Sequence, residues 1–240
     1  MQSDAIELLK HDSNYYGKFG QRYLSNSDIY SLLKNPRKFR QKEKSLPLLE
    51  GGYFHTDKLD TYSIMDVSSR ATKGFKEFIK DNDLDPYDVL LTKEVEKINL
   101  WVDTMKSNFE MYTDIYAKGN IYEQPAVATI FGMDWKGKAD IVTDTKVIDI
   151  KTSGNADKFK WSANDYNYDS QAYLYEQLFG KPVEFYIIDK TTLKLKIAKP
   201  SPETLLRGRE KVLKAIEVYK TFFSEDSSED ITQYIEREEF

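Results

Sequence analysis

The chain has 240 residues, of which 40% are hydrophobic and 31% are charged, and its formal net charge is −5 at pH 7. This length and apolar content suffice for one buried core, and the absence of cysteine excludes a disulfide framework. The negative balance argues against a protein that coats nucleic acid, because nonspecific affinity for phosphates comes mainly from lysine and arginine.

The amino end carries no feature of an export signal. Residues 1–5, Met-Gln-Ser-Asp-Ala, lack a basic start and an apolar core, and no apolar run in the chain is long enough to cross a bilayer. We therefore expect a cytoplasmic protein with no membrane partner.

The first predicted helix covers residues 27–35. Small polar residues after Leu24 favour a capped start, and Pro36 ends the helix. The same region concentrates positive charge in a chain that is acidic overall, at Lys34, Arg37, Lys38, Arg40, Lys42 and Lys44. This is a local basic cluster.

A helical amino-terminal part extends to residue 118, with further predicted helices over 68–81 and 92–117. Between the first two helices, Gly51-Gly-Tyr-Phe-His55 contains one of the two histidines. An imidazole can complete a metal site of mixed nitrogen and oxygen ligands, although a lone histidine is more often structural.

The pattern then changes to β-strands, predicted at residues 122–131, 134–143 and 146–151. Asp140 and Asp149 lie in apolar runs of the second and third strands, with Asp144-Thr145 turning between them. Because residues two apart on a strand project from the same side, Asp149 and Lys151 should share a face while Ile150 packs in the core. Such buried charges are costly unless they pair with each other or hold a cation and a phosphate.

The carboxyl-terminal part completes an α/β fold. We predict a helix at 169–179, a strand pair at 183–189 and 192–198, and a final helix at 203–223, followed by an acidic tail at 224–240. The fold class is then a central mixed sheet flanked by helices, with a helical amino-terminal region. The whole chain is expected to form a single domain, with its core at 119–200 and its last helix at 201–223.

The motifs together resemble those of a known family. Asp140 followed by Asp149-Ile-Lys151 is similar to the motif of the PD-(D/E)xK nuclease superfamily, although a salt bridge on a charged hairpin would give the same short pattern. Gln171 and Tyr175, one helical turn apart, resemble the Gln-x-x-x-Tyr helix of RecB-like nucleases. His55 is similar to the Gly-x-x-x-His element of RecB-like and RecE-like proteins. In order and spacing the chain looks most like RecE-type phage and prophage exonucleases, with a restriction-endonuclease-like core.

The resemblance implies roles for particular residues. Expected catalytic residues are Asp140, Asp149, Lys151, Gln171 and Tyr175. Expected metal ligands are His55, Asp140, Asp149 and the main-chain carbonyl of Ile150, with Glu123 as a further candidate. Expected DNA contacts are Arg70, Lys73, Gln171 and Tyr175. Hard oxygen ligands suit Mg²⁺ or Mn²⁺, one or two ions per site, and the absence of cysteine excludes the iron–sulfur cluster of some relatives.

The implied function is a metal-dependent DNA exonuclease of phage-type recombination or DNA processing. Two alternatives stay open, a structure-specific DNA endonuclease of the same fold and a noncatalytic DNA-binding module. The resemblance also leaves open a single-strand annealing partner and a ring-shaped homo-oligomer. If the chain is encoded by a phage, the compartment is the cytoplasm of a bacterial host.

Overall fold

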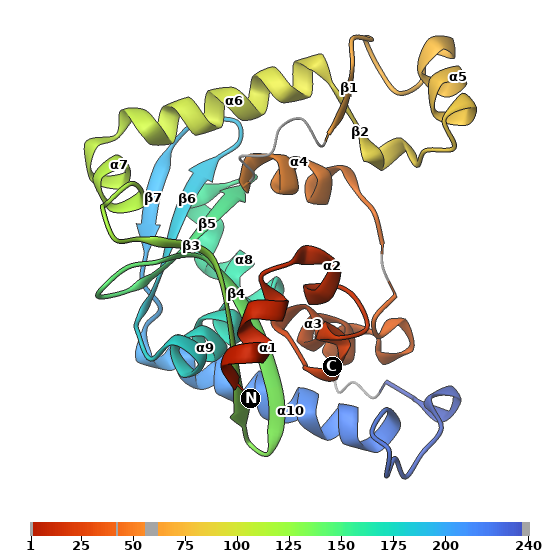
Figure 1. The fold of residues 1–240 in the computed structure, drawn as a ribbon, viewed down its shortest axis with the longest axis vertical. Coiled ribbons are helices and arrows are strands. Elements are labelled where there is room, and N and C mark those ends of the chain that lie inside the picture. Colours follow the sequence, from red (N-terminus) through yellow and green to blue (C-terminus); the bar gives the residue numbers. More distant parts are fainter. Residues whose placement is uncertain (1, 42, 56–61, 237–240) are drawn as a thin grey trace.

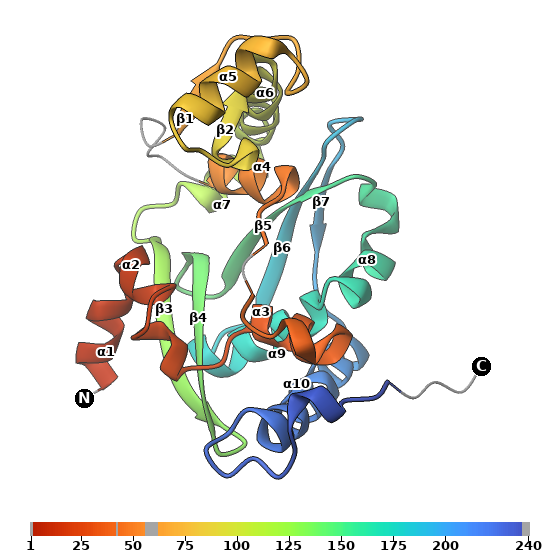
Figure 2. The same ribbon diagram turned by 90° about the vertical axis from the view of Figure 1, so that its right-hand side faces the viewer.

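The computed structural model describes residues 2–41, 43–55 and 62–236. Its centre is a five-stranded mixed sheet with helices on both faces (Figures 1 and 2). The strands are β3 Ile121–Ile130, β4 Met133–Val142, β5 Val147–Ser153, β6 Val183–Asp189 and β7 Leu195–Ala198, in the order β3-β4-β5-β6-β7. Among the neighbouring strands of this five-stranded sheet, only β5 and β6 run parallel. The predicted fold class, a mixed sheet flanked by helices with a helical amino-terminal region, is confirmed.

The helices before the sheet are α1 Gln2–Leu9, α2 Asp12–Tyr15, α3 Asn26–Lys34, α4 Leu46–His55, α5 Lys73–Asp81, α6 Thr92–Ser107 and α7 Phe109–Ile115. A small parallel pair, β1 Ser63–Met65 and β2 Val89–Leu91, packs with α5 at one end of the molecule. The later helices are α8 Phe159–Asp165, α9 Tyr168–Phe179 and α10 Pro202–Phe222. Short 3₁₀ turns are η1 Gly20–Arg22, η2 Pro36–Lys38, η4 Pro86–Asp88, η5 Ala156–Lys158 and η6 Ile231–Gln233.

Two hydrophobic cores lie on opposite faces of the sheet, and β6 contributes to both. Every residue of β6 is buried. Phe185 and Ile187 pack in the core that contains α3, α9 and α10, whereas Tyr186 and Ile188 pack in the core that contains α4, α6 and α7. Successive residues of a strand point to opposite faces of the sheet. Because helices cover both faces of this sheet, residues of β6 that point to either face are mostly apolar.

Two predicted helices differ from the observed ones. The helix predicted at 68–81 begins only at Lys73, because the Thr72 hydroxyl accepts a hydrogen bond from the Phe75 N–H and caps the helix there. The helix predicted at 92–117 is two helices. Asn108 has an extended backbone, and its side chain accepts from the Met111 N–H at 3.0 Å, so it ends α6 and starts α7.

Strands β4 and β5 pair only briefly. Their register pairs Ile141 with Ile148 and Val142 with Val147, and beyond these pairs the strands diverge. Leu24 lies beside the vacated edge of β4, where its N–H donates to the Asp134 carbonyl and its carbonyl accepts from the Lys136 N–H. The divergence leaves room between the two strands at Asp140 and Asp149.

The described part of the acidic tail folds back on the amino-terminal helices. The Arg37 guanidinium donates to the main-chain carbonyls of Thr232 and Tyr234 at 2.9 and 3.3 Å. Residues 237–240 of the predicted tail, and Lys42 of the basic cluster, lie outside the described residues. Among the helices that the structure describes, none combines the length and apolar content that a membrane crossing requires.

Candidate active site

Asp149 and Lys151 lie side by side on β5. Lys151 Nζ is 2.7 Å from Asp149 Oδ2, and the Asp149 side chain is only 2% exposed. The contact is a buried ion pair, and among the described residues Oδ2 has no hydrogen-bond donor other than this ammonium. Gln171 of α9 donates from Nε2 to the other oxygen, Oδ1, at 2.7 Å. One carboxylate oxygen is therefore held by the Gln171 amide, and the other faces the Lys151 ammonium.

Asp140 reaches the same place from β4. Its Oδ2 accepts a hydrogen bond from the Ile150 N–H at 2.7 Å, which replaces the missing backbone pairing between the diverging strands. His55, the last residue of α4, places Nδ1 3.5 Å from the same oxygen. Two carboxylates, an ammonium and an imidazole thus meet where β4 and β5 separate.

Helix α4, which carries His55, is fixed by a buried carboxylate. Glu50 is 4% exposed and binds Lys97 of α6 at 2.5 Å and Lys190, after β6, at 3.0 Å. Both ammonium groups also lie over the Trp101 ring, at 5.1 and 5.3 Å from its centroid. These contacts attach α4 to the face of the sheet that α6 covers, and so place His55 at the edge of the site.

Glu123 of β3 lies near Asp140. The residues on either side of Glu123 pair with β4, and Glu123 itself interrupts this pairing. Its φ angle is 49°, in the left-handed region that non-glycine residues seldom adopt. Although the residue has exposed surface, desolvation of its carboxyl group and the charge of Asp140 raise its pKa to about 7. Backbone strain and a carboxyl group that resists ionisation are both common at functional sites.

Burial and the opposite charges of the two partners also shift the pKa values of Asp149 and Lys151. Burial raises the pKa of Asp149 against the opposing charge of Lys151. Burial alone would lower the pKa of Lys151, but Asp149 and Asp140 outweigh it and raise that pKa above its usual range. Lys151 consequently stays an ammonium at neutral pH, placed where a phosphate could approach.

The other expected site residues have different surroundings. Tyr175 of α9 is buried, and its hydroxyl donates to the Lys138 carbonyl at 2.7 Å, which ties α9 to β4. Arg70 makes an ion pair with Glu94 and donates to the carbonyls of Pro86 and Val89. Lys73 on α5 is 88% exposed beside Glu77. Neither Arg70 nor Lys73 joins the cluster around Asp140, and their DNA contacts stay a prediction.

Lys138, which was not among the expected residues, and Tyr168 also lie beside the site. Lys138 lies two residues before Asp140 on β4, and its Nζ pairs with Asp12 at 2.6 Å. Lys151 Nζ lies 4.9 Å from the centroid of the Tyr168 ring. The signal for Lys138 was its period-two spacing from Asp140.

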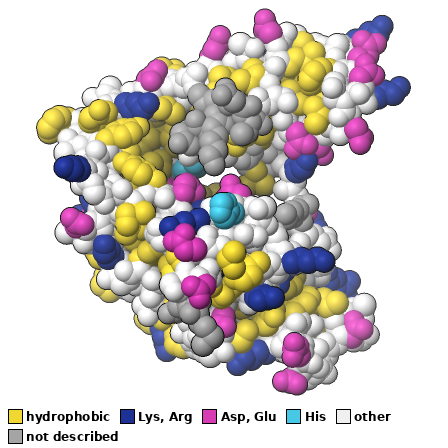
Figure 3. All heavy atoms as spheres, in the orientation of Figure 1, with side chains coloured by type: hydrophobic (Ala, Val, Ile, Leu, Met, Phe, Trp, Pro, Cys, Tyr) yellow, Lys and Arg dark blue, Asp and Glu magenta, His cyan; other side chains and the backbone are white. Residues whose placement is uncertain are grey.

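The donor set fits a divalent metal ion. No three acidic or histidine side chains of residues 2–41, 43–55 and 62–236 already form a metal-binding group. Even so, Asp149 Oδ2 is buried with only the Lys151 ammonium beside it, and desolvation together with the charge of Asp140 raises the pKa of the neighbouring Glu123. Carboxylate oxygens with an accessory imidazole suit Mg²⁺ or Mn²⁺. Figure 3 shows acidic, basic and histidine side chains gathered near the middle of this face of the molecule.

Comparisons with known proteins found one family model and several solved structures. A family model described as a PDDEXK-like domain of unknown function (DUF3799) matches residues 25–233. The crystal structure of a "putative exonuclease" from Eubacterium rectale has a TM-score of 0.59 and 17% sequence identity, covering 88% of this chain and 85% of that one. That of a phage related exonuclease from Haemophilus somnus 129PT has a TM-score of 0.34 and 16% identity, covering 65% of this chain and 89% of that one. No curated protein matches the chain.

Proposed function

Because the chain belongs to the DUF3799 family of PDDEXK-like domains, we propose that it is a metal-dependent exonuclease that hydrolyses phosphodiester bonds at DNA ends. The proposal takes Asp140, Asp149 and Lys151 as the acids and the lysine of the PDDEXK pattern. It also takes the chain as one nuclease domain with DNA as its substrate. The similarity to the "putative exonuclease" of Eubacterium rectale supports exonuclease activity only by analogy of fold.

The observation that carries the proposal is the surroundings of Asp149. A carboxylate that is 2% exposed, with the Lys151 ammonium 2.7 Å from one oxygen and the Gln171 amide on the other, is an expensive arrangement for folding alone. The arrangement suits a site that receives a cation and then a phosphate.

Asp140 and Asp149 would hold the metal, with His55, Glu123 and the Ile150 carbonyl as further candidates. When bound, a divalent ion supplies Lewis-acid chemistry, lowering the pKa of a water molecule and offsetting charge on the phosphate. The chain's own groups prepare the site for this. The Ile150 N–H orients Asp140, and the Gln171 amide orients Asp149.

Lys151 has the role of a charge partner for the phosphate. Its side chain stays protonated because the charges of Asp149 and Asp140 raise its pKa. It lies beside the metal-binding oxygens and can stabilise negative charge that develops on the phosphate during hydrolysis. A preorganised charge of this kind accounts for a hundredfold or more of rate in typical enzymes, roughly 3 kcal/mol.

The test is digestion of end-labelled linear duplex DNA with Mg²⁺ or Mn²⁺, with a covalently closed circle of the same sequence as substrate control. We expect mononucleotides from the linear DNA alone, and at least a hundredfold lower rates for Lys151→Ala and Asp149→Asn. Lys73→Ala, which changes an exposed lysine on α5, is the matched control and should lower the rate far less.

Other outcomes separate the alternatives. Nicked or linearised circles would replace the exonuclease proposal with an endonuclease of the same fold. Absence of cleavage with either metal, from a folded protein that still binds DNA, would leave a noncatalytic binding module.

A further inference from the structure

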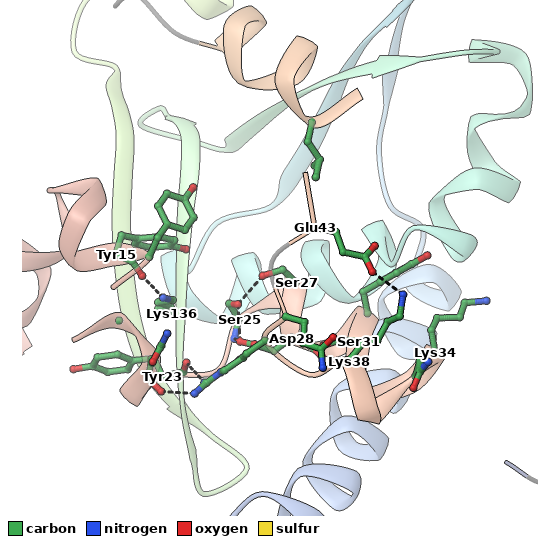
Figure 4. A pocket seen from close by; sticks show the side chains of 18 residues that line it. Tyr15, Tyr23, Ser25, Ser27, Asp28, Ser31, Lys34, Lys38, Glu43 and Lys136 are labelled. Carbon is green, nitrogen blue, oxygen red and sulfur yellow. Dashed lines mark hydrogen bonds and ion pairs between the residues drawn. The ribbon is translucent and has the colours of Figure 1, made fainter. Parts of the chain in front are cut away.

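A cavity of about 530 Å³ lies between α2 and α3 beside β4 (Figure 4). Lys136 of β4 lines it on one side, Tyr15 and Tyr16 line it next to α2, and Tyr30 and Lys34 line it from α3. Its volume is within the range of small-ligand sites. None of the residues assigned to catalysis or metal binding lines this cavity.

The cavity is lined by a buried lysine that has no ion-pair partner among the described residues. Lys136 is 7% exposed, donates to the Tyr15 carbonyl, and lies 4.3 Å from the centroid of the Tyr15 ring. In the part of the chain that the structure describes, it forms no ion pair with a carboxylate, and burial lowers its pKa to about 8 although the charge of Asp28 acts in the opposite direction. Of the two acids that line the cavity, Asp28 accepts from Ser25 and Arg40, and Glu43 pairs with Lys38. A buried ammonium in this position favours an anionic ligand.

The cavity also offers aromatic faces. Tyr16 is 58% exposed and Tyr30 is 46% exposed, although both line the cavity. Tyr30 has no ring partner among the described residues. Exposed aromatic side chains beside cationic ones are the usual means by which proteins bind unpaired nucleotides, because every base has a face that can stack.

Strand β4 connects the cavity with the candidate active site, because it carries Lys136 at the cavity and Asp140 at the site. Lys136, Lys138 and Asp140 are alternate residues of this strand and therefore project from the same side. Tyr16 lines the cavity and also lies 5.8 Å from the Lys138 ammonium, measured to its ring centroid. The Lys138 ammonium pairs with Asp12, whose side chain is 73% exposed and is free to give way to a phosphate.

We propose that this cavity binds the unpaired nucleotides of a single DNA strand that adjoin the scissile phosphate. Their phosphates would follow Lys138 and Lys136, and their bases would stack on Tyr16 and Tyr30. A base-paired end cannot present its base faces to these rings, so the substrate at the site is a frayed or single-stranded end. This inference rests on the proposed function only in placing the scissile phosphate at Asp140 and Asp149.

The test measures binding without cleavage. Fluorescence anisotropy of a labelled oligothymidylate is titrated with the protein in EDTA, using wild type, Tyr16→Ala, Tyr30→Ala and Lys136→Met. Tyr112→Ala on α7 is the matched control, because this tyrosine is 50% exposed and lies outside the cavity. We expect Tyr30→Ala and Tyr16→Ala each to weaken binding about tenfold, Lys136→Met to weaken it as well, and the control to bind like wild type.

The two surface tyrosines keep the test decisive if Lys136→Met does not fold. Wild-type affinity in both Tyr16→Ala and Tyr30→Ala would overturn the inference. So would a blunt duplex of the same length that binds as tightly as the single strand, or an oligouridylate that binds more tightly than the oligothymidylate. Tyrosine-dependent binding without metal-dependent cleavage would reject the nuclease proposal and keep the cavity assignment. Metal-dependent cleavage together with oligothymidylate binding that neither tyrosine variant weakens would keep the nuclease proposal and reject the cavity assignment.

Discussion

Asp189 at the end of β6 holds together the loops on both sides of it. Its Oδ2 accepts from the Ala156 N–H at 2.8 Å, and its Oδ1 accepts from the N–H groups of Thr191 and Thr192 at 3.0 and 2.8 Å. Burial alone would raise the pKa of Asp189, but these backbone donors outweigh it and lower the pKa to about 2. The ionised form of Asp189 therefore stabilises the folded state more than the protonated form does.

This gives a prediction for stability against pH. A carboxyl group whose pKa falls on folding stabilises fully above its unfolded value of about 3.8, and the stabilisation is lost as pH falls toward about 2. Asp189→Asn should therefore cost about 3 kcal/mol at pH 7, as charge-assisted hydrogen bonds are lost, and clearly less at pH 3. Urea unfolding at the two pH values measures both. Asp157→Asn nearby, an exposed acid paired with Lys194, should change stability by less than about 1 kcal/mol. An equal cost of Asp189→Asn at pH 7 and pH 3 would contradict this account.

At the same scale, sequence reasoning succeeded where only local geometry was needed. The closeness of Asp149 and Lys151 follows from strand alternation alone, and the structure has them 2.7 Å apart. The surroundings of Arg70 could not be predicted, because its partner Glu94 is 24 residues away and meets it only in the folded chain. The hydrogen bond from Ile150 to Asp140 was equally hidden, since it depends on where β4 and β5 diverge. The catalytic and metal-binding roles of these residues stay predictions.

At the scale of elements, the contact of α9 with α10 positions Gln171. Asp169 of α9 is fully buried and binds Arg207 and Lys211 of α10 at 2.7 and 3.0 Å. Between these two residues lies Gly208, where an added Cβ would come within 2.2 Å of the Asp169 carbonyl oxygen. The helices can approach this closely only because residue 208 has no side chain.

Gly208→Ala should consequently be costly. The clash is with backbone and cannot be relieved by a side-chain rotation, so we expect a loss of about 3 kcal/mol in the free energy of unfolding. Gly74→Ala on α5 is the control, because a Cβ there meets nothing within 4 Å, and it should be neutral or stabilise by up to about 1 kcal/mol. Urea denaturation of both variants decides the matter. Equal stabilities would show that α9 and α10 can separate at little cost.

The elements that the sequence predicted are those with strong periodicity or clear ends. Strands β3 to β6 and helices α9 and α10 have almost the predicted bounds. Helix α4 was missed because Pro47, Gly51 and Gly52 argue against a helix, and its packing against α6 and the sheet overrides that preference. Strands β1 and β2 have three residues each, which is too short for a period to be visible. Helix α8 was hidden in a segment rich in asparagine and aspartate that also suits a loop.

At the scale of the whole molecule, the candidate site joins parts that fold around different cores. His55 comes from α4 in one core, whereas Gln171 comes from α9 in the other, and the strands β4 and β5 lie between them. Desolvation and the charge of Asp140 raise the pKa of Glu123 to about 7, and Asp140 also raises the pKa of Asp149, so the carboxylates of the site repel one another. A ligand that neutralises this charge should therefore stabilise the entire fold and not only the loop that it touches.

Metal binding should accordingly raise the melting temperature. An ion at a hundred times its dissociation constant adds about 2.7 kcal/mol, and in a chain of this size each kcal/mol corresponds to roughly 2–4 °C. We expect Mn²⁺ or Mg²⁺ to raise the Tm of the wild type by about 5–10 °C, with reversal by EDTA, and Asp149→Asn to remove the rise. Asp226→Asn, which changes an exposed acid of the tail, should keep it. Differential scanning calorimetry distinguishes these results, and a rise of equal size in Asp149→Asn would mean that the ion binds elsewhere. In that event Asp149 would not be a metal ligand, and the divergence of β4 and β5 would need a structural explanation.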